Sequence, residues 1–384
     1  MNLSLTEEQL QFQTELHNFA QHEVAPLAAE YDRTGTFPWD TLKKMAAKGY
    51  LGIPIPKEYG GLGLDTICYL IALEELSFAC SSTGVITAVH TSVGTYPIYL
   101  FGNEEQKQKY VVPLAKGEKL GAFALTEPSA GSDAGAIAAI AERNPNNPGE
   151  YILNGSKVFI TNGTSAESII VIAVTNNSEG SKGISAFIVE KGTPGLSIGQ
   201  EERKLGLHAS EASELIFDNC VIPKENLLGE LGDGFKISMI TLDAARLGIA
   251  AQALGVAKAA FFECLRFVKE HNFKGKPFSK MQSIQFTLAD IVTELEAARL
   301  LMYKAAYMKD NNEIFTKEAS MAKVLATETA MKSVNVTTRL MGEYGYTKRS
   351  PIERYLRDVK VMEIYEGTSE IQRLIIGKQL LKSI

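Results

Sequence analysis

The segment Tyr151-Ile-Leu-Asn-Gly-Ser-Lys-Val-Phe-Ile-Thr161 lies near the middle of the chain, where short apolar runs alternate with turn residues. Two of these runs flank Asn154-Gly155, a dipeptide that favours a tight hairpin turn. The pattern therefore predicts a β-hairpin here. Further strands are predicted at Ile169–Val174, Gly183–Val189, Leu196–Ile198 and Glu214–Phe217. Together these runs indicate a compact β domain of sandwich or barrel type.

Helical periodicity flanks this β segment on both sides. On the N-terminal side, Thr6 and Gln9 have the spacing of a capping box, and helices are expected at about 7–24, 40–48, 65–79 and 104–114. On the C-terminal side, four long helices with short connections predict a bundle, at 235–270, 279–309, 315–341 and 351–382. The sequence therefore predicts an α+β fold with an N-terminal all-α domain at 1–120, a middle β domain at 121–230 and a C-terminal four-helix bundle at 231–384.

The composition argues against several classes of protein. Of the 384 residues, 45% are hydrophobic and 22% are charged, which is typical of a soluble globular protein. With a net charge of -6 and no basic stripe, no nucleic-acid partner is expected. No membrane span or secretory signal is visible, and no GxGxxG motif joins a strand to a helix. The four cysteines and five histidines are dispersed along the chain, which argues against a disulfide framework or a metal site. Reduced thiols favour a cytoplasmic location. The cysteines are Cys68, Cys80, Cys220 and Cys264.

Four motifs, in order along the chain, carry a family resemblance. They are Ala122-Phe-Ala-Leu-Thr-Glu-Pro-Ser-Ala-Gly-Ser-Asp133, Asn154-Gly-Ser-Lys-Val-Phe-Ile-Thr-Asn162, Thr241-Leu-Asp-Ala-Ala-Arg246 and Ile364-Tyr-Glu-Gly-Thr-Ser-Glu-Ile-Gln-Arg373. With them the chain resembles the acyl-CoA dehydrogenases over essentially its whole length, most closely the short-chain (butyryl-type) members. The resemblance implies non-covalent FAD in each subunit, a homotetramer built as a dimer of dimers, and electron-transferring flavoprotein as the oxidant.

The resemblance also implies a reaction, the conversion of a short acyl-CoA to its trans-2-enoyl-CoA. Removal of the α proton needs a nearby base, and a carboxylate serves best when burial raises its pKa toward neutrality. The glutamate of the Tyr-Glu-Gly-Thr motif is that base in the family, and here it is Glu366. Gly367 beside it allows close approach of the backbone to the substrate. The alternative base position in another branch of the family is Ala244-Ala245 here, which carries no carboxylate.

The remaining site residues follow from the same resemblance. It assigns FAD contacts to residues of the β domain and of the bundle, namely Phe123, Leu125, Thr126, Ser132, Phe159, Ile160, Thr161, His271, Gln282, Arg339, Gly342, Thr368 and Glu370. It assigns acyl-CoA contacts to Ser132, Asp243, Arg246 and Gly367. Without the resemblance, Phe159 would be interpreted as a core strand residue, and Asp243 with Arg246 as an ion pair between successive turns of a helix.

The chain departs from the family pattern at two places. His271 stands where an arginine is usual, and Arg339-Leu-Met-Gly-Glu343 replaces a Gln-Ile-Phe/Leu-Gly-Gly segment. Loss of one arginine contact to a phosphate corresponds to roughly 1.5–3 kcal/mol. Since the residues expected around the flavin ring are largely intact, we expect FAD to bind with an altered contact to its AMP half.

Two other functions are compatible with the sequence. One is a dehydrogenase or oxidase that acts on an acyl group held by a carrier protein; Ser132, Asp243 and Arg246 favour CoA over this carrier. The other is an FAD-poor, non-catalytic paralogue, against which the intact Glu366 argues. The sequence leaves open the length of the acyl chain and the choice between a flavoprotein acceptor and oxygen.

Overall fold

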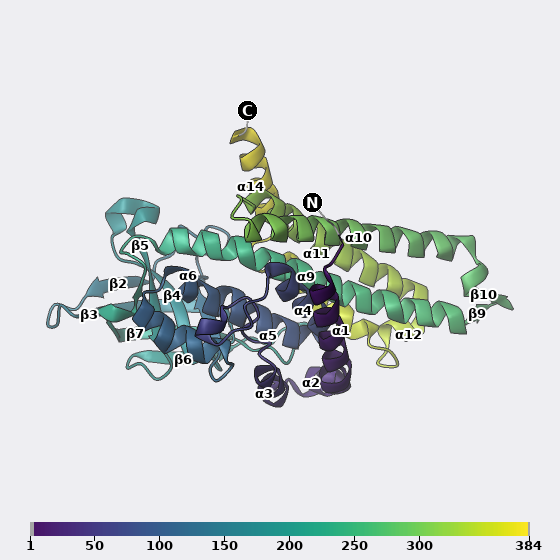
Figure 1. The fold of residues 1–384 in the computed structure, drawn as a ribbon, viewed down its shortest axis with the longest axis horizontal. Helices are drawn as coiled ribbons and strands as arrows, with labels where there is room; N and C mark the ends of the chain where they lie inside the picture. The colour runs from purple at the N-terminus through teal and green to yellow at the C-terminus, as the bar shows by residue number, and fades with distance from the viewer. Residues whose placement is uncertain (1–3, 383–384) are drawn as a thin grey trace.

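The computed structural model describes residues 4–382 and shows helices, then a β sheet, then long helices along the chain (Figure 1). The β sheet lies at one end of the molecule, and the long helices extend away from it to the opposite end (Figure 1). This order confirms the predicted α+β fold with its N-terminal helices, middle β region and C-terminal helical region.

The N-terminal part consists of helices joined by short π-helical and 3₁₀ turns. The predicted capping box is present, because the Gln9 N–H donates to Thr6 Oγ1 (3.2 Å) and the Thr6 N–H donates to Gln9 Oε1 (2.9 Å). Such reciprocal bonds satisfy donors that a helix start leaves unpaired. The helices are α1 (Glu7–Phe19), α2 (Ala28–Thr34), α3 (Trp39–Ala47), α4 (Thr66–Ala79), α5 (Ser81–Val89), α6 (Tyr96–Phe101), α7 (Glu104–Gln106) and α8 (Val112–Ala115).

Within the described residues, the middle part forms one connected eight-stranded sheet with the order β6-β7-β3-β2-β4-β5-β8, and β1 pairs in parallel with β4. Every residue of β4 is buried, which explains its continuous apolar sequence. The strands are β1 (Gly121–Ala124), β2 (Ile140–Arg143), β3 (Glu150–Thr161), β4 (Ser168–Val174), β5 (Ile184–Glu190), β6 (Leu196–Glu201), β7 (Ala212–Pro223) and β8 (Leu227–Leu228).

The predicted hairpin at Asn154-Gly155 is wrong. The two apolar runs belong to one strand, β3, and both pair with the same neighbour, β7. The register shifts between Leu153 and Gly155, so the dipeptide forms a bulge instead of a turn. Gly155 has φ +137°, and a Cβ there would lie 2.8 Å from Ala139 Cα. The glycine is therefore required by a close backbone approach within the sheet.

The C-terminal part contains three unbroken long helices, as predicted, but the fourth is interrupted. The helices are α9 (Gly234–Glu270), α10 (Gln282–Asp310), α11 (Thr316–Met341), α12 (Glu343–Tyr346), α13 (Ile352–Val359) and α14 (Ser369–Lys382), with a small hairpin of β9 (Asn272–Phe273) and β10 (Lys276–Pro277) at the far tip. The predicted single helix at 351–382 is therefore wrong. Its interruption at 360–368 contains a 3₁₀ turn and two residues with positive φ, Glu366 and Gly367.

Helix α9 forms the centre of the molecule and packs against α4, α10 and α11. Its small residues permit close packing; a Cβ on Gly255 would lie 2.3 Å from the carbonyl oxygen of Glu74 in α4. Within residues 4–382, α9 is the one helix long and apolar enough to cross a membrane, but 78% of its apolar window is buried inside the protein. Packing in the protein core accounts for this hydrophobic stretch.

Candidate active site

The Glu366 turn, residues 364–368, connects the 3₁₀ segment after α13 to α14. Glu366 has φ +53° and Gly367 has φ +93°, conformations that end a helix and that a non-glycine residue seldom adopts. Side chains from two helices hold the turn in place. Gln372 Nε2 donates to the carbonyl oxygens of Glu366 (3.1 Å) and Gly367 (2.9 Å), and the buried Lys323 Nζ donates to that of Gly367 (2.8 Å). The turn is therefore fixed although its backbone is strained.

The carboxyl group of Glu366 is poorly solvated. The residue as a whole is half-buried, but its Oε2 atom is shielded from solvent and has no hydrogen-bond partner among the described residues. Burial disfavours the charged carboxylate and raises the pKa of Glu366 to about 7, although the positive charges of Arg246 and Lys323 oppose this shift. An unpaired, partly desolvated carboxyl that titrates near neutrality is suited to proton transfer.

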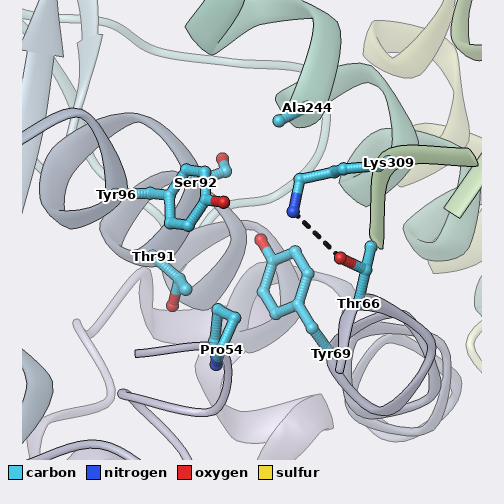
Figure 2. Close-up of a pocket in the computed structure, with 8 residues that line it drawn as sticks. All are labelled: Pro54, Thr66, Tyr69, Thr91, Ser92, Tyr96, Ala244 and Lys309. Atoms are coloured by element: carbon cyan, nitrogen blue, oxygen red, sulfur yellow. Dashed lines mark hydrogen bonds between the residues drawn. The ribbon is translucent and has the colours of Figure 1, made fainter. Parts of the chain in front are cut away.

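A small cavity lies between the N-terminal helices and the bundle (Figure 2). It is lined by residues of the N-terminal helices and of the bundle, namely Pro54, Thr66, Tyr69, Thr91, Ser92, Tyr96, Ala244 and Lys309. Burial raises the pKa of the Tyr69 hydroxyl, and the negative charge of Glu366 raises it further, so this wall of the cavity lies within electrostatic range of the Glu366 carboxylate. The same tyrosine donates to the carbonyl oxygen of Ala88 (3.2 Å) and is thereby fixed in the wall.

Asp243 and Arg246 form an ion pair on α9 and stand on either side of the cavity residue Ala244 in the sequence. Asp243 also accepts a hydrogen bond from the Thr316 hydroxyl (2.5 Å), and the Nε atom of buried Arg246 has no partner among the described residues. The positive charge of Arg246 acts on Glu366. The structure therefore brings Asp243 and Arg246, two of the four predicted substrate-binding residues, to the region of the Glu366 turn.

The predicted flavin platform consists of Phe123–Thr126, which comprises the end of β1 and the residues after it, and of the C-terminal end of β3. Phe123 packs in one hydrophobic cluster with Tyr365, the neighbour of Glu366. Phe159 on β3 has φ +59° and is 63% exposed, because a bulge between Lys157 and Ile160 turns its ring outward. Its interpretation as a core residue is thereby excluded. Ile160 is buried, and Thr161 is half-buried.

A buried ion pair joins the two halves of this platform. Lys157 Nζ lies 2.7 Å from Glu127 Oε1 and 3.0 Å from the carbonyl oxygen of Leu125, and the Val158 N–H donates to the carbonyl of Thr126 (2.9 Å). Both charged side chains are almost fully buried. This pair was not predicted from the sequence. A lysine within an apolar strand was the signal for Lys157, but nothing in the sequence identified its partner.

Four predicted FAD contacts lie at the end of the bundle that is opposite the sheet (Figure 1). His271, Gln282, Arg339 and Gly342 gather where α9 and α11 end and α10 begins, near the β9–β10 hairpin at the opposite end from the sheet (Figure 1). Along α9, the distance from Arg246 to His271 is about 37 Å at the rise of an α-helix. His271 stacks on Phe267, with a ring-centroid distance of 4.0 Å. One chain therefore does not bring these residues to the Glu366 turn.

The other predicted residues lie at the surface. Ser132 is exposed in the loop after β1, and Glu370 is exposed in the first turn of α14. Thr368 precedes that helix, and its hydroxyl accepts a hydrogen bond from the Ile371 N–H (3.3 Å).

Three family models match consecutive parts of the chain. The acyl-CoA dehydrogenase N-terminal domain matches residues 6–118, the middle domain residues 122–220 and the C-terminal domain residues 232–381. The chain belongs to the acyl-CoA dehydrogenase family. It is therefore an oxidoreductase, and FAD is the cofactor of the family.

Individual relatives match this dehydrogenase over its full length. It is 48% identical to the short-chain specific acyl-CoA dehydrogenase of Clostridium acetobutylicum, over 100% of both chains. The solved butyryl-CoA dehydrogenase of Megasphaera elsdenii is 43% identical, with a TM-score of 0.97 over 99% of this chain and 100% of that one. A third similar chain comes from a structure described as the electron transferring flavoprotein of Acidaminococcus fermentans. It is 46% identical, with a TM-score of 0.97 over 100% of both chains.

The residues of the platform fit FAD. Phe159 presents an exposed aromatic face beside the loop after β1, and its strained φ is maintained by the surrounding strand instead of by burial of its own ring. A flat, partly apolar ring system would cover such a face. Phe123, Leu125 and Thr126 would then hold the ring edge, while Phe159, Ile160 and Thr161 would cover one side.

Proposed function

We propose that this dehydrogenase converts a short-chain acyl-CoA to the trans-2-enoyl-CoA, with Glu366 as the base that removes the α proton. One observation carries the proposal: an unpaired carboxyl with a pKa of about 7 lies on a fixed turn, within electrostatic range of Tyr69, which lines a small cavity. Since the cavity is small and the similar proteins include short-chain and butyryl-CoA dehydrogenases, a short acyl group is the substrate favoured.

The reaction begins with the acyl chain in the cavity and its α carbon next to the Glu366 carboxylate. The carboxylate takes the proton, and its new O–H is tolerated because burial favours the neutral form. Negative charge then develops on the thioester oxygen. We assign its stabilisation to the backbone N–H of Glu366, because the residues that hold the turn also fix the direction of that donor. When bound, FAD supplies the acceptor for the hydride that leaves the β carbon.

Substrate binding is assigned to Ser132, Asp243, Arg246 and Gly367. The Asp243–Arg246 pair, anchored by Thr316, places a cation close to the turn without leaving it uncompensated. We also propose that Thr368 and Glu370, on the same turn and the start of α14, contact FAD.

The predicted domain boundaries at 120/121 and 230/231 are compatible with the change from helices to strands and back to helices.

A homotetramer would complete the FAD site. Because His271, Gln282, Arg339 and Gly342 lie far from the platform of their own chain, we propose that they contact the AMP half of FAD on a neighbouring subunit. Exposed aromatic rings at this end of the bundle support an interface there, namely Phe273, Phe286 and Tyr346. Leu374, Leu380 and Leu381 are also exposed on α14, which projects from the bundle (Figure 1).

We propose electron-transferring flavoprotein as the electron acceptor. The similarity to a chain in the structure described as the electron transferring flavoprotein of Acidaminococcus fermentans supports this choice.

A cytoplasmic location is proposed on the basis of the cysteines, all four of which are buried thiols.

Substrate addition tests the proposed reaction directly. Under anaerobic conditions, butyryl-CoA should bleach the flavin absorbance of the purified protein, and butyryl groups on a carrier protein should bleach it far more slowly. Preferential bleaching by the carrier-bound group would instead support the alternative substrate. A protein that is colourless and cannot be reconstituted with FAD would contradict the proposed function and support a non-catalytic role.

The pKa of Glu366 predicts the pH dependence of the reaction. Since only the ionised carboxylate accepts a proton, kcat/KM for butyryl-CoA should rise with pH and level off above about pH 7. The free energy of unfolding should depend on pH in the opposite direction. Because the folded state binds the Glu366 proton more tightly than the unfolded state, the protonated group stabilises the fold fully below about pH 4.5, and this stabilisation is lost as pH rises through 7. A pH–rate profile with no inflection between pH 6 and 8 would argue against Glu366 as the base.

A further inference from the structure

One wall of the cavity includes a lysine side chain from the bundle. Lys309, in the last turn of α10, extends into the cavity between the N-terminal helices, where its ammonium and the hydroxyls of Tyr69 and Tyr96 point toward one another (Figure 2). Its Nζ donates to Thr66 Oγ1 (2.9 Å) and lies 4.7 Å from the centroid of the Tyr96 ring. Two anchors from different elements therefore hold this long side chain in one position.

Lys309 is only half-buried, so its side chain lies between the cavity and the solvent. A second, more open groove lies outside, lined by Pro54, Pro56, Lys57, Glu58, Gly63 and Leu64. Pro54 lines both the groove and the cavity. The cavity and the groove are thus neighbours that share the wall at Pro54.

Helix packing fixes the base of Lys309 as well as its tip. The adjacent Asp310 accepts hydrogen bonds from the backbone N–H (3.0 Å) and the hydroxyl of Thr66, the first residue of α4. The end of α10 is therefore joined to the start of α4 at this point. Because the backbone is held by Asp310 and the ammonium by Thr66 and Tyr96, the four methylenes of Lys309 form a fixed surface.

We propose that Lys309 is a specificity-determining residue that closes the far end of the acyl cavity and so limits this dehydrogenase to short acyl chains. The proposal rests on the proposed function, since it names the substrate length accepted by the same site. The apolar stem of the lysine would contact the terminal methyl group of the acyl chain, while the ammonium remains at the solvent side, an arrangement common for lysine. A longer chain would have to displace the stem and break both anchors.

Two substitutions test this role. Lys309→Ala removes the stem, so the ratio of kcat/KM for octanoyl-CoA to that for butyryl-CoA should rise by roughly tenfold or more, within the range that a few methylenes in an apolar pocket produce. Lys309→Met retains most of the stem but not the charge, and the ratio should rise less. The matched control is Lys304→Ala, an exposed lysine on the same helix that does not line the cavity.

The results separate this proposal from the proposed function. If butyryl-CoA reduces the flavin but the octanoyl-to-butyryl ratio is unchanged in Lys309→Ala, or rises equally in Lys309→Met or Lys304→Ala, Lys309 does not close the cavity. If no acyl-CoA reduces the flavin of the wild-type protein, the proposed function itself fails. Calorimetric affinities of both thioesters for the Lys309 variants in the Glu366→Gln background provide a readout without turnover and should show the same shift in ratio.

Discussion

Replacing Glu366 by glutamine should leave FAD bound while the rate of dehydrogenation falls by roughly 10³-fold or more. Glutamine has nearly the shape of glutamate, so the turn held by Gln372 and Lys323 should persist. An amide, however, cannot accept the α proton at a useful rate. Because Glu366 accepts the proton in the transition state and not on substrate binding, kcat should fall much more than the affinity for butyryl-CoA. Stopped-flow measurement of flavin reduction, together with FAD absorbance and calorimetric binding of butyryl-CoA, checks each part.

The matched control is Glu363→Gln, which changes a carboxylate three residues away that pairs with Lys360 (2.7 Å). Glu363 is not among the proposed substrate or FAD contacts, so flavin reduction should remain within a few-fold of the wild-type rate. Equal losses in the two variants would indicate a general effect on the segment. Undiminished turnover in Glu366→Gln would place the base at another residue. The charge change also predicts that Glu366→Gln abolishes the inflection near pH 7 in any residual activity.

The order of the structural parts could be predicted from the sequence because it depends on local patterns. The capping box at Thr6 and the periodicity of α9, α10 and α11 depend on residues close in the chain. The break in the fourth bundle helix was not predicted, because the segment retains an apolar period through Tyr365. The positive φ of Glu366 depends on tertiary contacts, chiefly those of Lys323 and Gln372, which no local pattern reveals.

The hairpin error has a similar origin. Asn154-Gly155 is compatible with a turn, but it is equally compatible with a bulge, and only the identity of the neighbouring strand decides between them. For the candidate site, the resemblance supplied Glu366, whereas the cavity residues Tyr69 and Lys309 were not named. They come from α4 and α10, far apart in the chain, and are brought together by helix packing. The roles of the predicted site residues stay predictions.

Loss of the buried Lys157–Glu127 pair should be the largest effect on stability. The Lys157→Met variant removes the ammonium but leaves the Glu127 carboxylate buried, with only the N–H groups of Ala138 (2.7 Å) and Ala139 (2.9 Å) to compensate its charge. Breaking one partner of a buried pair typically costs about 3–5 kcal/mol. The free energy of unfolding, measured in denaturant, should fall by this order. FAD should also bind more weakly, because the same lysine joins Leu125 to β3.

A double variant separates the charge effect from the packing effect. Adding Glu127→Gln to Lys157→Met removes the uncompensated charge, so the double variant should be more stable than Lys157→Met alone. The amide oxygen still accepts one backbone N–H, so one of the two donors stays satisfied. Lys44→Met is the surface control; its pair with Glu23 has a similar length (2.6 Å), but both side chains are largely exposed, and water screening should make its effect far smaller. If Lys157→Met were no more destabilising than Lys44→Met, the buried pair would not be what holds the Leu125–Glu127 segment against β3. The strained backbone of Phe159 would then have to be maintained by the remaining backbone hydrogen bonds, which include the bond from the Val158 N–H to the Thr126 carbonyl.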